Sequence, residues 1–598
     1  MSRLAELNGW LDERVGHKKL LSALLDEPIQ GGARFAYVFG STLLGAFLVQ
    51  VVTGVALMSA YAPSDKTAWA SVHYISTQLS GGWLVRGLHH YGAQAMVVLL
   101  GAHMTQVAFF GAYKKPREVT WWVGLGLLAL TLGFALTGYL LPWDQKGYWA
   151  TRVATNIAGT IPVVGGFQQR ALQGGSEYGS LTLTRFYTLH VFVLPAALAG
   201  LVAVHLALFR RHGVTPSVKA DTKRFDRFFP RQMFLDTAAV LAVLGFVLYL
   251  AVRDHGAPLD APADPSSDYP ARPEWYFLAL FQLLKYFHGP LELVGTVVIP
   301  TLAGLYLFAL PLIDRGADRA VRPRLKVLAP LVGIGLGAVL LTTLAFRSDA
   351  ADAGFQKERA LADVRAKRAV ELAKAGVPPE GPLAMMARDP VLHGPVLFEK
   401  HCAGCHVLAG LGTEKDRTAP VLDGWGTEAW IMQMMHDPDG DARFGRTAYK
   451  GEMPSMDVAP PGDADFKPMS KGDMQAAAAF LASQGDERGE PVPDGAWRRD
   501  PAVVKKGEEI VKARCTACHL YKGEGDDGGQ ELAPELSGYG SLAWTASQIR
   551  DPSSKATYRP KSVAEDRKGH MPKFERDMTA QDIEVLARWV RMKAHGGP

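Results

Sequence analysis

Four histidines stand inside two long apolar stretches of the chain, where neither charge balance nor surface exposure explains them. His89 and His103 are fourteen residues apart in one stretch, and His190 and His205 are fifteen apart in the other. At 1.5 Å per residue, these intervals correspond to about 21 to 23 Å of α-helix, most of a hydrocarbon core of about 30 Å. Each helix therefore offers one imidazole near each membrane face.

Two such helices side by side would bring the imidazoles together as two pairs, His89 with His190 and His103 with His205. Each pair can bind a planar iron macrocycle from both faces, so the pattern predicts two stacked bis-histidine b haems and an electron path across a bilayer. Polar groups at this depth are costly and usually functional, although any one histidine could equally be hydrogen-bonded inside a helix bundle. His90 is about 100° further round the helix and is predicted not to be a ligand.

Glycines repeat at the histidine interval in two neighbouring apolar stretches. Gly40 and Gly54 are fourteen residues apart, as are Gly124 and Gly138. A glycine removes the side chain where another group must approach the backbone closely. We expect these glycines to make room for the edges of the two macrocycles, and the matched intervals favour haem sites over isolated core histidines.

The 598-residue chain, with a net charge of +5, consists of two unlike parts. Its basic residues cluster beside apolar runs and not in one groove-sized patch, which excludes a nucleic-acid role. The C-terminal part beyond residue 346 contains no run of membrane length. Seven predicted spans fill the first part: Phe35 to Met58, Val85 to Phe110, Trp121 to Leu141, Thr184 to Phe209, Met233 to Val252, Leu291 to Leu312 and Val327 to Phe346.

The basic clusters predict the orientation in the membrane. They precede the first span and follow the second, fourth and sixth, with Arg14, Lys114, Arg211 and Arg324 as examples. All four segments lie on one side if every run spans, and the positive-inside rule places that side in the cytoplasm. We therefore expect a bacterial inner-membrane protein with a cytoplasmic N-terminus and a periplasmic C-terminal part.

The four cysteines, Cys402, Cys405, Cys515 and Cys518, all belong to two CxxCH motifs, HCAGCH at 401–406 and RCTACH at 514–519. A redox dithiol or a zinc site is the competing interpretation of CxxC. The histidines that directly follow, His406 and His519, together with the external location, favour two covalently bound c haems. No cysteine is left over for an iron–sulfur cluster.

The segments LPWDQKGYWATRVATNIAGTIPVVG (141–165) and LTRFYTLHVFVLP (183–195) resemble the cytochrome b family of quinol:cytochrome c oxidoreductases, and the likeness extends over roughly residues 30–345. The fifteen-residue histidine interval resembles the bf type, and the last three spans resemble its subunit IV. The resemblance implies a low-potential haem on His89 and His190 near the outer face and a high-potential haem on His103 and His205. Bf-type proteins carry a thioether-forming cysteine where this chain has Val38, so their extra haem is not expected.

Four further residues acquire roles from the resemblance. Arg86 and Arg185 precede their histidines on the outer side and are expected to meet haem propionates, the alternative being snorkelling arginines. Asp236, one turn inside the fifth span, resembles the family aspartate beside the inner quinone site, and Arg210 is a second candidate there. A carboxylate satisfied by a neighbouring loop is the alternative for Asp236.

The outer loop before the sixth span contains PEWYF, residues 273–277, which resembles the family's quinol-oxidation motif. Glu274 would accept a proton from quinol, because removing an electron from a neutral quinol is uphill until it deprotonates. Tyr276 would line the same pocket. The alternative is a loop carboxylate that pairs with Arg272 or Lys285.

The C-terminal part contains an internal repeat. LFEKHCAGCH, APVLDGWG and HDPDG recur as IVKARCTACH, APELSGYG and RDPSS, and each copy resembles a class I cytochrome c domain. The resemblance implies a sixth, methionine ligand for each haem. Met453 and Met571, each followed by proline, lie 47 and 52 residues after their haem histidines. Met456 and Met578 are the rival candidates.

Together these features predict an all-α protein, in which a seven-span transmembrane bundle of four haem-binding helices plus three further helices is followed by two class I cytochrome c domains. The predicted domains are residues 1–215 (four-helix haem bundle), 216–348 (three-helix part), 349–385 (a solvated helical linker), and 386–490 and 491–598 (the two c domains).

The favoured function is quinol oxidation at the outer face by a Q-cycle. Because the chain has no Rieske motif, a separate Rieske iron–sulfur protein is expected as a partner, alongside the membrane quinone pool. The c domains would pass electrons to a soluble cytochrome c or a terminal oxidase, and the family implies a homodimer. The alternative is a haem anchor that moves electrons between an external redox partner and quinone without bifurcation. A tethered carrier whose membrane part is only an anchor would not need four ordered histidines.

Overall fold

The computed structural model describes residues 3–415, 417–462, 464–485, 499–525, 533–558 and 571–597. The chain divides into two compact units, Met1–Leu383 and Ala384–Pro598. Apart from one two-stranded antiparallel ribbon, the regular structure of the described residues is helical. The predicted all-α class is therefore confirmed.

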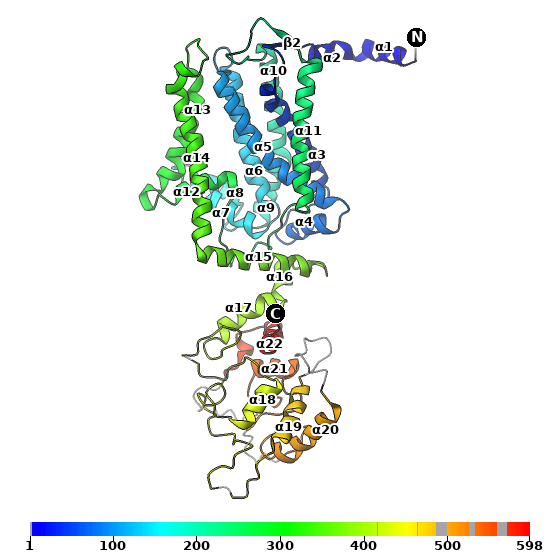
Figure 1. Cartoon of the computed structure of the whole chain (residues 1–598), viewed down its shortest axis with the longest axis vertical. Coiled ribbons are helices and arrows are strands. Elements are labelled where there is room, and N and C mark those ends of the chain that lie inside the picture. Colours follow the sequence, from blue (N-terminus) through cyan, green and yellow to red (C-terminus); the bar gives the residue numbers. More distant parts are fainter. Residues whose placement is uncertain are drawn as a thin grey trace. The chain divides into compact units, whose positions relative to one another are not determined.

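The first unit contains long helices joined by short helices and 3-10 or π turns (Figure 1). Its elements are α1 (Arg3–Val15), α2 (His17–Leu25), β1 (Pro28–Gln30), η1 (Phe35–Tyr37), α3 (Val38–Met58), α4 (Ala68–Thr77), α5 (Gly82–Phe110), α6 (Glu118–Leu140), α7 (Gln145–Gly159), α8 (Gly165–Gln173), α9 (Ser180–Thr188), η2 (Leu189–Val193), α10 (Leu194–His212), β2 (Phe225–Arg227), η3 (Phe228–Gln232), α11 (Met233–Arg253), η4 (Trp275–Phe277), α12 (Leu278–Leu284), η5 (Gly289–Leu291), η6 (Val294–Val298), α13 (Ile299–Ile313), η7 (Arg322–Arg324), α14 (Leu325–Ala351) and α15 (Ala353–Ala373), with α16 (Pro382–Ala387) at the junction of the units.

Among the described residues, seven helical segments are long and apolar enough to cross a membrane, and each contains one of the seven predicted spans to within one residue. Their outward side chains are apolar: Val52, Phe234 and Leu241 are 69%, 71% and 63% exposed. A surface of this kind is stable against lipid and not against water. The first unit is thus an integral membrane domain. The segments are Phe35–Met58, Gly82–Phe110, Glu118–Leu140, Ser180–His212, Phe228–Arg253, Gly289–Ile313 and Arg322–Ala351.

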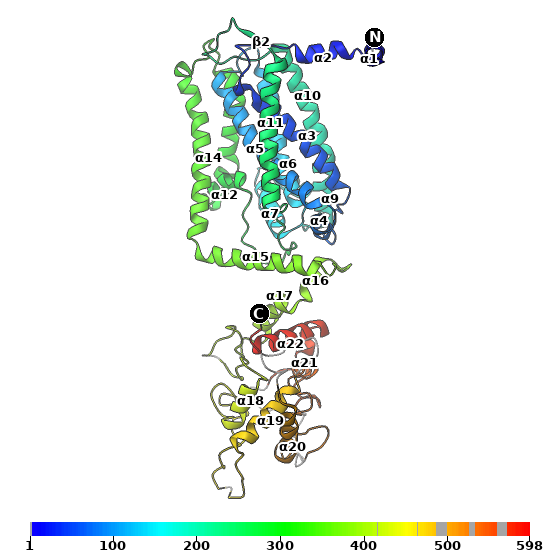
Figure 2. The same ribbon diagram turned by 45° about the vertical axis from the view of Figure 1, so that its right-hand side comes forward.

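The first five spans form one bundle, and α13 and α14 stand beside it in both views (Figures 1 and 2). Within the bundle α3 packs on α5 and α11, and α6 packs on α10. The short helices α4, α7, α8 and α9 gather at one end, which we call the α4 end. The N-terminal segment and the β1–β2 ribbon, paired from Pro28 with Arg227 to Gln30 with Phe225, mark the opposite, ribbon end.

A buried ion cluster at the ribbon end joins the α5–α6 connection to α13 and α14. Asp314 Oδ1 lies 2.6 Å from Lys114 Nζ, and its Oδ2 accepts from Arg324 Nε at 2.8 Å and from the Tyr113 hydroxyl at 2.6 Å. Buried charges are tolerated when they are paired and hydrogen-bonded in this way. Lys114 and Arg324, which the sequence places in basic cytoplasmic clusters, therefore tie spans together and are not solvated.

The predicted linker is helical but is not a solvated spacer along its whole length. Asp352 caps the start of α15 by accepting from the Phe355 amide, and the helix packs on α4. Its buried residues are two alanines, Ala369 and Ala373, which are 0% and 1% exposed. Two small side chains make too weak an apolar face to be recognised in a charged sequence, yet they allow the helix to lie close against its neighbour.

The second unit has two hydrophobic clusters as its core. One cluster joins α17 (Pro390–His401) to α22 (Ala580–Ala594), and the other joins α19 (Lys471–Ser483) to α20 (Pro501–Ile510). The remaining elements are α18 (Glu428–His436), η9 (Val511–Cys515), α21 (Leu542–Arg550) and η10 (Phe574–Arg576). In both clusters the first helix of one repeat copy packs on the last helix of the other copy.

Candidate haem and quinol sites

The four membrane histidines lie in two facing pairs. The ring centroids of His89 and His190 are 6.3 Å apart with the rings at 71°, and those of His103 and His205 are 6.5 Å apart at 74°. Since a metal–imidazole bond is about 2 Å long, two imidazoles on opposite sides of one iron have centroids about 6 Å apart. The residues in these two positions therefore fit axially ligated haem.

A π-helical turn explains why the two histidine intervals differ. His190 belongs to η2, a π turn that joins α9 to α10 within one continuous helical span. Pro195 follows at the start of α10 and has no backbone N–H to donate to the preceding turn. A π turn accommodates one extra residue. Fifteen residues from His190 to His205 thus cover the depth that fourteen cover between His89 and His103.

Each of the four repeated glycines faces one of the four histidines. A Cβ on Gly138 would lie 2.5 Å from Cε1 of His190, and one on Gly54 would lie 3.3 Å from Cε1 of His89. The distance is 3.6 Å in the other two pairs, Gly40 with His103 and Gly124 with His205. The glycines therefore make room for the imidazole rings themselves, where the sequence had led us to expect room for the macrocycle edges.

Two threonines orient the histidines of the pair at the α4 end. Thr53 Oγ1 lies 2.9 Å from His89 Nδ1, and Thr137 Oγ1 lies 3.0 Å from His190 Nδ1. Each hydroxyl donates to a carbonyl of its own helix, at 2.7 and 2.8 Å, so it accepts from the imidazole Nδ1–H. This arrangement leaves Nε2 with its lone pair available to a metal. Sequence reasoning missed both threonines, although each directly precedes a repeated glycine.

The pair nearer the ribbon end lacks this support. Among the described residues, Nδ1 of His103 and Nδ1 of His205 are buried without a hydrogen-bond partner. The residues that precede the facing glycines here are Phe39 and Val123, which have no hydroxyl. The two pairs thus have similar ring spacing and different hydrogen bonding.

Arg86 and Arg185 both bind backbone carbonyls at the α4 end. Arg86 donates to Ala257 O at 2.7 Å and to Pro258 O at 2.6 Å, which anchors the segment after α11. Arg185 donates to Ala171 O near the end of α8. Both arginines therefore hold connecting segments close to the histidine pair at this end.

Glu274 pairs with a lysine that sequence reasoning missed. Lys146 Nζ lies 2.8 Å from Glu274 Oε1, and the Glu274 side chain is 13% exposed. The two partners considered from the sequence, Arg272 and Lys285, lie instead 2.9 and 3.8 Å from Asp349. Lys146 belongs to the PWDQKGYW segment, so the ion pair joins the two motifs that carried the family resemblance.

The start of α7 positions Lys146. Asp144 caps the helix by accepting from the Gly147 amide at 2.8 Å. Burial, with a smaller contribution from nearby Asp260, raises the pKa of Asp144 to about 6. The Lys146 ammonium also lies 5.7 Å from the ring centroid of Tyr139. A lysine in the first turn of a capped helix is thus directed at the PEWYF segment.

His90 belongs to the PEWYF side of the bundle and not to the histidine pair. Its Nε2 lies 2.9 Å from Gln94 Nε2, and Gln94 Oε1 accepts from Trp275 Nε1 at 3.4 Å. Tyr276 is next in the chain, and burial raises the pKa of its phenol, which is neutral at physiological pH. Gln94 therefore links the helix that carries His89 to the loop that carries Glu274.

Asp236 and Arg210 both lie at the ribbon end and have protein partners there. Asp236 is buried in the first turn of α11 and accepts from Gln232 Nε2 at 2.7 Å. Gln232 Oε1 in turn accepts from the Arg34 amide at 2.8 Å. Arg210 donates to Glu27 Oε2 at 3.2 Å. The hydrogen bond from Gln232, one turn earlier, thus partly offsets the free-energy cost of burying the Asp236 carboxylate.

Both CxxCH histidines are oriented for axial ligation. His406 Nδ1 lies 2.8 Å from Pro420 O, and His519 Nδ1 lies 2.8 Å from Pro534 O, so Nδ1 donates and Nε2 keeps its lone pair. Burial raises the pKa of the Cys402 thiol to about 12 and that of Cys515 to about 11. Reactive dithiols have lowered pKa values. No group of three or more His, Cys, Asp or Glu residues that could hold a metal ion occurs in the described part of the chain. The motifs fit covalent haem.

The four candidate methionines divide between the two clusters of the second unit. Met571 packs against the cluster that contains Cys402, and Met578 belongs to it. Met453 and Met456 pack against the cluster beside Cys515. Each proline-flanked methionine is therefore near the cysteine motif of the other repeat copy.

Comparison with known proteins identifies the membrane region. The family model "Cytochrome b/b6/petB" matches residues 24–213, and "Cytochrome b(C-terminal)/b6/petD" matches residues 262–351. The cytochrome bc complex cytochrome b subunit of Chlorobaculum thiosulfatiphilum is 36% identical over 321 residues, which cover 52% of this chain and 74% of the relative. The chain belongs to the cytochrome b family.

Other relatives extend this identification. Cytochrome b6 of Gracilaria tenuistipitata var. liui is 39% identical over 36% of this cytochrome b chain and 99% of the relative. A chain from a solved structure described as "Hyperthermophilic respiratory Complex III" superposes with a TM-score of 0.51 at 28% identity, over 61% of this chain and 97% of that one. The predicted family is therefore confirmed by sequence and by fold.

The C-terminal unit matches cytochrome c families. The model "Cytochrome c" matches residues 391–485, and "Cytochrome C oxidase, cbb3-type, subunit III" matches residues 502–590. The protein is thus a cytochrome b with a C-terminal cytochrome c region, and its role is electron transfer. Haem b and haem c are the cofactors that these families imply.

Proposed function

We propose that this cytochrome b–c chain is the haem-carrying subunit of a membrane quinol:cytochrome c oxidoreductase that works by a Q-cycle. The observation that carries the proposal is the presence of two imidazole pairs at two depths of the bundle, with ring centroids 6.3 and 6.5 Å apart. A tethered electron carrier whose membrane part is only an anchor does not need two such pairs. The Glu274–Lys146 pair at the α4 end supports a quinol site on the same side as His89 and His190.

The donor atoms support the following haem assignments. His89 with His190 and His103 with His205 would bind two b haems. Cys402, Cys405 and His406 would bind one c haem, and Cys515, Cys518 and His519 a second, with Met453 and Met571 as sixth ligands. Bound there, haem supplies one-electron transfer, so that quinol oxidation can be divided between a Rieske protein and the bundle.

Glu274 is the proposed proton acceptor during quinol oxidation. An ionised carboxylate only accepts hydrogen bonds, and Glu274 accepts one from the Lys146 ammonium at 2.8 Å. A quinol hydroxyl that displaces Lys146 would donate to Glu274 and lose its proton there. Tyr276 would line the same site. At the ribbon end, Asp236 and Arg210 are the proposed proton-handling residues of a second site, where quinone is reduced.

The seven spans and the basic ribbon-end connections support a proposed topology. We place the ribbon end in the cytoplasm of a bacterium and the α4 end on the periplasmic side of the inner membrane. The cytochrome c region then receives electrons outside, from a separate Rieske iron–sulfur protein, and passes them to a soluble cytochrome c or a terminal oxidase. The proposed assembly is a homodimer that exchanges quinol with the membrane pool.

Quinol-dependent cytochrome c reduction by the purified complex tests this function. The complex with its Rieske partner should be active, and an inhibitor of the outer quinol site should abolish the activity. Removal of the Rieske protein should abolish it as well. Full activity without a Rieske protein would overturn the Q-cycle in favour of a haem anchor that passes electrons without bifurcation.

A further inference from the structure

The two cytochrome c repeats do not fold as two successive bodies. In a class I arrangement the first helix of a copy, which precedes CxxCH, would pack on the last helix of the same copy. Here α17 of the first copy packs on α22 of the second, and α20 of the second packs on α19 of the first. Each cluster therefore contains the cysteine motif of one copy and the methionine segment of the other.

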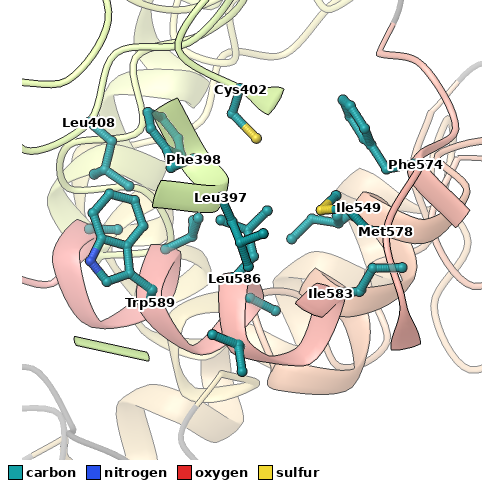
Figure 3. Close-up of a cluster of buried hydrophobic side chains, with 14 residues drawn as sticks. Leu397, Phe398, Cys402, Leu408, Ile549, Phe574, Met578, Ile583, Leu586 and Trp589 are labelled. Atoms are coloured by element: carbon teal, nitrogen blue, oxygen red, sulfur yellow. The ribbon is translucent and has the colours of Figure 1, made fainter. Parts of the chain in front are cut away.

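Contacts around the first cysteine motif come from the second copy. The rings of Phe398 and Trp589 are 5.1 Å apart, and the ring of His401, next to Cys402, lies 6.0 Å from that of Phe574. In Figure 3 the Cys402 side chain projects into the space between Phe398 and Phe574. Phe574 follows Met571 by three residues, so the second Met-Pro segment lies beside the first haem-binding motif.

The second cysteine motif has the reciprocal contacts, which come from the first copy. Arg514, next to Cys515, donates to Lys467 O, and its guanidinium lies 6.0 Å from the ring centroid of Phe466. Tyr521 packs on Phe480 of α19 with ring centroids 5.5 Å apart. Phe466 and Phe480 both belong to the segment that follows Met453 in the first copy.

Two glycine-flanked turns lie where the chain passes from one cluster to the other. The sequences GWG (424–426) and GYG (538–540) stand at equivalent places, and all four glycines have positive φ, between 65° and 80°. Left-handed backbone of this kind favours glycine and turns the chain sharply. Trp425 and Tyr539 meet there, with ring centroids 5.8 Å apart. Each copy thus crosses from one cluster to the other at an equivalent turn, and the two turns are in contact.

We propose that the two cytochrome c copies exchange their second halves, so that each haem takes its histidine from one copy and its methionine from the other. His406 then pairs with Met571 as the axial ligands of the haem on Cys402 and Cys405. His519 pairs with Met453 at the haem on Cys515 and Cys518. This inference rests on the proposed function only in requiring two c haems, and its consequence is that neither copy can complete a haem site alone.

Single-haem versions of the full chain test the ligand exchange directly. Cys515→Ala with Cys518→Ala leaves only the first c haem, whose methionine ligation is read from the far-red methionine-to-ferric-iron absorption band. Met571→His should abolish that band and lower the potential of this haem, because methionine ligation raises haem potential. Met453→His is the matched control and should leave both unchanged.

The reciprocal chain, with Cys402→Ala and Cys405→Ala, should show the opposite dependence. There Met453→His should abolish the band, and Met571→His should not. Loss of the band in the first chain with Met453→His and not with Met571→His would overturn the exchange and restore ligation within each copy. A chain without covalent haem in a haemochrome assay would instead refute the cofactors of the proposed function.

A double-mutant cycle tests the exchange without reference to haem ligation. Phe398→Ala and Trp589→Ala, alone and together, should shift the thermal midpoint of the c region non-additively, because the two rings are in contact. The cycle of Phe398→Ala with Phe480→Ala is the control, since Phe480 is the corresponding aromatic of the first copy, and it should be additive. Coupling between Phe398 and Phe480 but not between Phe398 and Trp589 would overturn the exchange even if the methionine variants proved unstable.

Discussion

The membrane bundle and the cytochrome c region bring their candidate haem ligands together in different ways. In the bundle, intervals of fourteen and fifteen residues along two helical spans place two histidine pairs at two depths, and the facing glycines repeat at an interval of fourteen. In the c region, candidate ligands that the repeat assigns to one copy lie in different clusters. Spacing along the chain is thus a good guide to pairing in the first region and a poor one in the second.

The difference has a simple physical origin. A helix converts sequence separation into distance at a constant rise, so an interval along a membrane span is also a depth. Two similar domains in tandem instead offer each half two nearly equivalent partners. Local structure is the same with either partner, and long-range packing such as Phe398–Trp589 and Phe480–Tyr521 distinguishes them.

Removing one membrane histidine should have the largest effect. His103→Leu should abolish one b-type signal in reduced-minus-oxidised spectra and leave the other, because each pair would bind its own haem. His90→Leu is the matched control on the same helix and should keep both signals. Loss of a b haem in the His90 variant would show that the residue interval does not identify the haem-binding histidines.

A methyl group opposite His190 should have the next largest effect. Gly138→Ala would place Cβ 2.5 Å from the imidazole, so the ring must move and most of the b haem nearer the α4 end should be lost. Gly133→Ala, five residues earlier on α6, meets Leu194 at 3.9 Å and should be almost neutral. Haem content per chain checks both variants, and equal losses would remove the special role of Gly138.

In the cytochrome c region, Trp589→Ala should destabilise the hydrophobic cluster that contains Cys402 of the first cysteine motif. Trp589 is 1% exposed, and truncating a buried aromatic costs about 3 to 5 kcal/mol. Hydrogen exchange should therefore rise in α17 of the first copy and stay unchanged in α20. Phe480→Ala should instead raise hydrogen exchange in α20 and leave it unchanged in α17. Faster hydrogen exchange in α20 of the Trp589→Ala variant would contradict the proposal that the two copies swap their second halves.

The smallest expected effect concerns the two threonines. Replacing Thr53 with valine removes a hydrogen bond to His89 Nδ1 worth about 0.5 to 1.5 kcal/mol. The potential changes only by the difference in that bond between the ferric and ferrous states, so about 20 to 60 mV for one electron is the upper limit. The haem nearer the α4 end should become easier to reduce, because its ligand donates less charge to the ferric iron.

The mirror variant is Val123→Thr, which supplies a hydroxyl one residue before the glycine that faces His205. It should lower the potential of the haem nearer the ribbon end. Redox titration of both b haems checks these shifts, and a change at the wrong haem would reverse the assignment of the pairs to the two ends.

Much of the membrane region could be predicted from sequence, because apolar length, histidine interval and glycine interval are all local patterns. The threonines at His89 and His190 escaped prediction because hydroxyls in apolar helices usually bond their own backbone, as these also do. Lys146 escaped it because 128 residues separate it from Glu274. The Asp314 cluster escaped it because charges near span ends ordinarily face water.

The amino-acid sequence alone determined the spans, the depth of each histidine and the two CxxCH motifs, since each depends on residues close together along one helix or turn. Only the tertiary structure decided which lysine meets Glu274 and which repeat copy packs beside each cysteine motif. These choices depend on contacts between segments far apart in the chain, and similar local sequences satisfy either choice equally well until the cores are packed.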